Sequence, residues 1–74
     1  SINKKYLELR PDQQSLEDAK DLEPFHQRTE LGREVMLFEN IGKEKLEVFG
    51  EVRPPVIADL FMAIMETTRQ RGDR

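Results

Sequence analysis

The sequence lacks cysteine and tryptophan and contains a single histidine, His26. Without cysteine, disulfides and thiolate metal sites are excluded. One histidine disfavours a zinc site, which usually needs several His or Cys ligands. The four glycines are isolated from one another, so there is no glycine-rich phosphate-binding loop. We therefore expect neither a metal nor a cofactor.

Long apolar runs are also missing, and the chain is short. The 74 residues allow one small domain, residues 1–74, which buries only about 60% of the surface of its unfolded chain. Since disulfides are excluded and a metal site is disfavoured, oligomerisation is the remaining way to stabilise it. No run is long enough to span a membrane, and no apolar segment follows Lys4 and Lys5 as in a secretory signal. We expect a cytoplasmic protein.

The N-terminal third is strongly charged and is interrupted by two prolines. Residues 1–10 fit a short strand or a frayed arm equally well. After Pro11, residues 13–22 carry apolar side chains at a spacing of three, which predicts a short helix that ends before Pro24. We expect residues 1–24 to form a charged, mobile arm with a short helix.

Residues 33–53 predict a β-hairpin. Two runs with alternating apolar residues, 33–39 and 45–53, flank a loop that contains Gly42. Val35 and Leu37 face one way and Met36 and Phe38 the other, so the first strand is apolar on both faces, as in strands covered from both sides. A helix over 29–41 is the rival interpretation, because its apolar residues also fit a helical period.

The prolines Pro54 and Pro55 introduce the most apolar segment, which we predict to be a helix over 55–70. Proline suits the first turn of a helix, where its missing N–H has no partner to lose. On a helical wheel, one apolar stripe is followed round the helix by a second apolar flank, and the polar side is narrow. The stripe comprises Val56, Ile57, Leu60 and Ile64; the flank comprises Ala58, Phe61, Met62 and Met65. The predicted fold is thus a small α+β domain: N-terminal helix, hairpin, and C-terminal helix packed on the hairpin.

One hairpin covers only one side of such a helix. Either the N-terminal helix covers the flank through Leu16 and Leu22, or another chain does. Methionine is frequent at adaptable binding surfaces, which favours a partner. We expect a non-catalytic protein–protein interaction module, a small regulatory or accessory subunit that forms a homodimer or joins a larger assembly. The expected partner-binding residues are Phe61, Met62, Met65, Ala58, Phe38 and Phe49.

Other chemistry is weakly supported by the sequence. His26 has no nucleophile near it in sequence, and the carboxylates of residues 17–21 are typical of a solvated helix face, so we expect no enzyme. The alternative is a small dimeric nucleic-acid-binding regulator with basic termini, although the net charge of −3 disfavours it. Its phosphate contacts would come from Lys4, Lys5, Arg69, Arg71 and Arg74.

Overall fold

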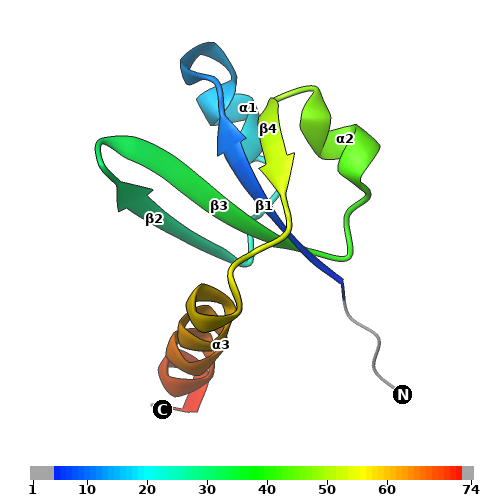
Figure 1. Ribbon diagram of the computed structural model, residues 1–74. Helices are drawn as coiled ribbons and strands as arrows, with labels where there is room; N and C mark the ends of the chain where they lie inside the picture. Colours follow the sequence, from blue (N-terminus) through cyan, green and yellow to red (C-terminus); the bar gives the residue numbers. More distant parts are fainter. Residues whose placement is uncertain (1–4, 73–74) are drawn as a thin grey trace.

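The chain forms a four-stranded antiparallel sheet with two short helices on one face and a longer C-terminal helix on the other (Figure 1). The computed structural model describes the backbone of residues 5–72 and the side chains of residues 5–70. The elements in chain order are β1 (Tyr6–Pro11), the 3-10 turn η1 (Gln13–Ser15), α1 (Leu16–Lys20), β2 (His26–Glu30), β3 (Arg33–Glu39), α2 (Lys43–Glu47), β4 (Gly50–Arg53) and α3 (Ile57–Gly72).

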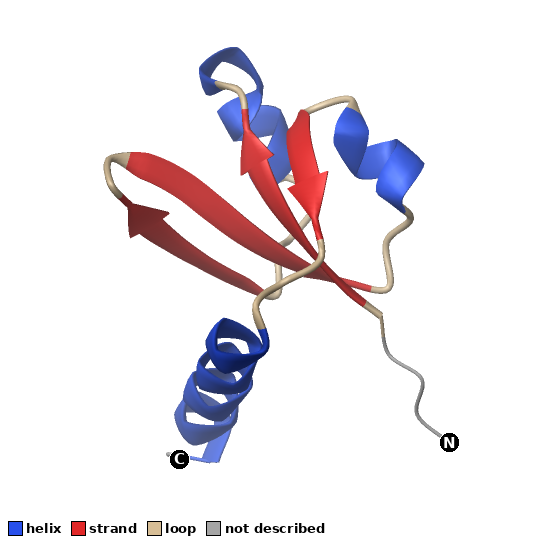
Figure 2. Cartoon of the chain, viewed as in Figure 1, coloured by secondary structure: helices blue, strands red, loops and turns tan. Residues whose placement is uncertain are grey.

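The sheet has the strand order β2-β3-β1-β4, so β3 and β1 are central and β2 and β4 form its edges (Figure 2). Leu9 of β1 lies opposite both Met36 of β3 and Val52 of β4. Since opposed residues of an antiparallel pair share a face, these three side chains point to the same side of the sheet.

That side holds the hydrophobic core. Leu9, Met36 and Phe38 pack there with Ala19 of α1 and Leu46 of α2, and all five are buried. Partly buried residues complete the cluster: Leu7, Leu16, Leu22, Ile41, Phe49 and Val52. The two short helices are therefore held to the sheet by apolar contacts.

The opposite face is mostly charged. It carries Glu8 and Arg10 of β1 and Arg28 and Glu30 of β2, around the buried apolar pair Val35 and Leu37. The prediction that β3 is apolar and covered on both faces is confirmed, because Val35, Met36, Leu37 and Phe38 are all at most 3% exposed. The rival interpretation of residues 29–41 as a helix is wrong.

The predicted order of N-terminal helix followed by hairpin is also wrong. Residues 6–11 form a central strand before the helical turns, and β3 pairs with β2 and β1 rather than with residues 45–53. That second run instead divides into α2 and β4. The alternation was misleading because Leu46 reaches the core from a helical turn, whereas Val48 remains 75% exposed.

Strand β2 lies in a segment that the sequence indicated only as a connector. It joins β3 through Leu31 and Gly32, whose φ angles of 51° and 79° both lie in the left-handed region. Two such residues fit the type I′ turn that links tight hairpins. Near this turn Glu34 accepts hydrogen bonds from Gln27 Nε2 (2.8 Å) and Thr29 Oγ1 (2.9 Å). Both hydrogen bonds lower the pKa of the Glu34 carboxyl, and the bond from Gln27 has the larger effect.

Candidate functional site

Helix α3 contacts the charged face of the sheet mainly through polar side chains. Asp59 accepts from Arg28 Nη2 at 3.4 Å, and Glu66 accepts from His26 Nε2 at 3.0 Å. Between these two contacts lies Ala63, which is 2% exposed and is the one buried residue among the described side chains of α3. Ala63 therefore lies on the side of α3 that faces the sheet.

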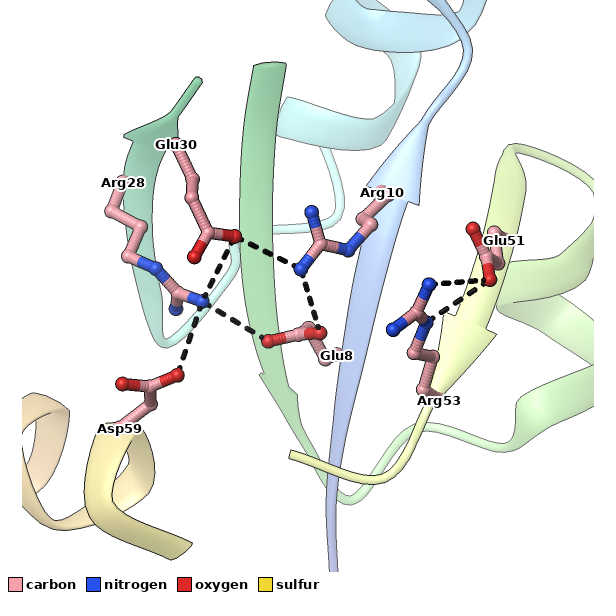
Figure 3. A network of polar contacts seen from close by, with 7 residues as sticks. All are labelled: Glu8, Arg10, Arg28, Glu30, Glu51, Arg53 and Asp59. Carbon is pink, nitrogen blue, oxygen red and sulfur yellow. Dashed lines mark hydrogen bonds and ion pairs between the residues drawn. The ribbon is translucent and has the colours of Figure 1, made fainter. Parts of the chain in front are cut away.

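Beneath the first turn of α3, five charged residues form a connected cluster (Figure 3). Glu8, whose side chain is 4% exposed, lies 3.2 Å from Arg28 and 3.6 Å from Arg10. Glu30 joins both arginines, at 2.9 Å from Arg10 and 3.8 Å from Arg28. Asp59 extends the cluster to α3. Each carboxylate already faces an arginine, which favours a structural role for the cluster: it fixes β1, β2 and α3 to one another.

The opposite side of α3 is apolar and faces away from the sheet. Ile57, Phe61, Met62 and Met65 are 73%, 62%, 69% and 67% exposed. Ile57, Phe61 and Met65 are spaced by four residues, and Phe61 is about 160° round the helix from Ala63. The helix therefore faces the sheet with Ala63 and polar residues, whereas these four large apolar residues face outward; Leu60 and Ile64 are half-buried. We call these four residues, with the exposed Ala58, the outer face of α3.

Four of the six predicted partner-binding residues thus share one exposed face: Ala58, Phe61, Met62 and Met65. The alternative cover by the N-terminal helix is not what the structure shows, because Leu16 and Leu22 pack in the core on the other face of the sheet. Phe38 is buried in that core and Phe49 packs against it, so neither contributes to the outer face.

Ile57 and Val56 were predicted to lie in the apolar stripe that packs on the hairpin, but both are largely exposed, and Ile57 belongs to the outer face. The wheel shows which residues of a helix share a side, but it does not show which side meets the sheet. Ala63 carries the one available signal, because a small residue between two carboxylates permits close contact with a charged surface.

Two hollows of the surface offer alternative sites. One, of about 720 Å³, is lined largely by exposed polar residues around η1 and the start of β3, including Asp12, Gln13 and Arg33. The other, of about 540 Å³, borders the outer face at Met62 and Met65 and is rimmed by Glu66 and Arg69. Only the second adjoins exposed apolar residues, so it extends the same surface.

The basic residues of the nucleic-acid alternative are only partly described. Lys5 and Arg69 are exposed. Lys4 and Arg74 lie outside the described residues, as does the side chain of Arg71. Arg10, Arg28 and Arg53 each face a carboxylate within the sheet, so they add little to a phosphate-binding surface.

His26 holds α3 to the sheet through Glu66 rather than facing a nucleophile. Within residues 5–72, no group of three or more His, Asp or Glu side chains is arranged to hold a metal ion. In the same part of the chain, no helix is long and apolar enough to cross a membrane. Comparisons with protein-family models, curated proteins and solved structures find no match for this chain.

Proposed function

We propose that this chain is a non-catalytic protein-binding module, a small regulatory or accessory subunit whose outer face of α3 is buried by another protein chain. The observation that supports this function is the exposure of Ile57, Phe61, Met62 and Met65 on one side of one helix. Burying a large apolar side chain is worth about 1.5–3 kcal/mol. A helix that exposes several large apolar side chains on one side is typical of a binding surface.

Two features of composition agree with this function. Met62 and Met65 have unbranched, flexible side chains that adapt to the shape of a partner. Phe61, next to Met65 on the outer face, is the kind of rigid aromatic residue that contributes most to binding at interface centres. The lack of cysteine fits a reducing compartment, and we expect the module to act in the cytoplasm.

Site-specific photocrosslinking tests this function. Phe61 is replaced by p-benzoylphenylalanine, and the full chain is irradiated in an extract of the cells that produce it. The matched control has the same replacement at Leu31, which is 98% exposed at the β2–β3 turn and far from α3 in the fold. We expect discrete crosslinked proteins, the chain itself included, from position 61 and none from position 31. Equal or absent crosslinking at the two positions would contradict the proposal.

A second substitution measures the strength of the contact. Phe61→Glu places a charge at the centre of the outer face, where a partner would have to desolvate it. We expect at least a tenfold loss of affinity for whatever chain is crosslinked, since truncation of central aromatic residues commonly costs over 1.4 kcal/mol.

A further inference from the structure

We propose that the chain which covers the outer face is a second copy of this protein, packed through α3 against α3 in antiparallel orientation about a twofold axis. This inference rests on the proposed function and names its partner. Three properties of the helix carry it: the spacing of the exposed residues, the order of their sizes, and the position of the charge beside them.

The spacing is that of a two-helix seam. Ala58, Phe61, Met65 and Thr68 follow one another at intervals of three, four and three, and all four are exposed. Apolar residues at these intervals form the seam along which two helices pack side by side. Ile57 and Met62 flank the seam and widen it.

The sizes along the seam are symmetric: small, large, large, small. A twofold axis level with residue 63 places Phe61 opposite Met65 of the second copy, and Ala58 opposite Thr68 of the second copy. Both central contacts then join a thioether to an aromatic ring, a favourable pairing. The small residues at both ends allow the helices to approach closely. A surface that matches itself under a twofold axis is what a symmetric dimer requires.

Charge selects the orientation. Arg69 lies beside the seam and is exposed. In a parallel pair, Arg69 of one copy would lie beside Arg69 of the other, and like charges so close repel each other. In the antiparallel pair, the two arginines are separated by on the order of 18 Å along the axis, well beyond the Debye length of about 8 Å at physiological salt.

The available area predicts a weak dimer. If a large apolar residue has about 200 Å² of accessible surface, the exposed fractions of Ile57, Phe61, Met62 and Met65 leave roughly 500 Å² per copy. Two copies would bury about 1,000 Å², the lower limit of specific interfaces. We expect a dissociation constant in the micromolar range. Because α3 projects away from α1 and α2, the two sheets would lie on opposite sides of the helix pair (Figure 1).

Sedimentation equilibrium of the full chain tests the self-association. Between about 1 μM and 1 mM, we expect a reversible monomer–dimer equilibrium for the wild type. Phe61→Glu should sediment as a monomer over the same range. Its circular dichroism spectrum should show that it remains folded. A wild type that stays monomeric throughout, or a Phe61→Glu variant that still dimerises, would overturn the inference.

Disulfide trapping tests the orientation, and the absence of cysteine from the chain gives a clean background. We expect an equimolar mixture of Ala58→Cys and Thr68→Cys chains to form a mixed disulfide dimer on mild oxidation, at least tenfold faster than either variant alone. A mixture of Thr68→Cys with Val48→Cys, a residue exposed next to α2, serves as the control. Rapid dimerisation of Thr68→Cys alone would indicate a parallel pair and contradict the proposal.

Crosslinking at position 61 distinguishes a failure of the self-pairing from a failure of the proposed protein-binding function. A product of two copies of the chain supports both. A product with a different protein, together with a monomeric wild type, retains the protein-binding function and overturns the self-pairing. No product and no dimer would overturn both.

Discussion

Glu8 occupies a buried position in the middle of the central strand β1, with 4% of its side chain exposed. A carboxylate loses much hydration energy in such a place unless cations and hydrogen-bond donors replace the water. Arg28 lies on one side of it and Arg10 on the other, at 3.2 and 3.6 Å. Arg10 lies on the same strand as Glu8 but Arg28 lies on β2, so both arginines face the buried charge only when β2 lies in its native register.

Replacement of Glu8 by Gln should therefore destabilise the fold. Glu8→Gln keeps the size of the side chain but leaves two partly buried guanidinium groups with only Glu30 and Asp59 as counterions. We expect the free energy of unfolding to fall by about 2–3 kcal/mol, as a lower urea midpoint at unchanged slope.

The matched control is Glu51→Gln on β4. Glu51 pairs with Arg53 at 2.9 Å, and both side chains are about half exposed. Exposed pairs contribute little, so the change should be within about 0.5 kcal/mol. Similar losses for the two variants would show that the buried cluster is not a special determinant of stability.

At the scale of secondary-structure elements, the sequence predicted those elements that a local pattern of residues determines. Strand β3 was recognisable because its apolar residues alternate between two covered faces, and α3 because two prolines precede a long apolar segment. Segments whose structure depends on distant partners were not recognisable. Residues 43–47 are too short for a helical period to be visible, and they are helical because Leu46 packs into a core contributed by other strands.

The candidate site was partly predictable for the same reason. That α3 is too apolar to be covered by one hairpin follows from its sequence, and Phe61, Met62 and Met65 are indeed exposed. Which side of the helix meets the sheet depends on Arg28 and His26 of β2, a strand that the sequence did not indicate. The Leu31-Gly32 pair was its only local signal, and leucine is an unusual residue at a positive φ.

The junction between β4 and β1 yields a prediction about one glycine. A Cβ at Gly50 would overlap the carbonyl oxygen of Arg10 and lie 2.8 Å from the Cα of Pro11. Both are backbone atoms of a central strand, so they cannot move aside cheaply. Gly50→Ala should cost about 2–4 kcal/mol, measured by urea unfolding, and should reduce amide protection first along β4.

Gly42, the N-cap of α2, is the control for that change. It has a φ of −68°, and a Cβ built there meets no atom within 4 Å. Gly42→Ala should therefore shift stability by no more than about 0.5 kcal/mol. Equal effects of the two alanines would mean that β4 does not approach β1 as closely as described.

For the whole molecule, the two faces of the sheet are covered by different physical means. Apolar contacts hold α1 and α2 to the face that carries Leu9, Met36 and Phe38. Two polar contacts and Ala63 hold α3 to the other. The two polar contacts fix the orientation of α3 and leave Phe61 and Met65 free to contact another chain. The attachment of α3 and its binding surface should thus respond independently to mutation.

Substitution by glutamate on each side of α3 checks this independence. Ala63→Glu forces a longer, charged side chain against the sheet between Asp59 and Glu66, so both overpacking and repulsion oppose docking. We expect a loss of about 2–3 kcal/mol. Phe61→Glu, two residues away, changes a side chain that already faces water, and the monomer should lose no more than about 0.5 kcal/mol.

Urea unfolding of both variants, at a concentration well below the dissociation constant measured for the wild type, makes the comparison on monomers. At high concentration, the Phe61→Glu variant should keep a stable monomer fold but should form no dimer. If Phe61→Glu unfolds the monomer as severely as Ala63→Glu does, Phe61 belongs to the core of a single chain. The outer face of α3 would then be no binding surface, and both proposals built on it would fall together.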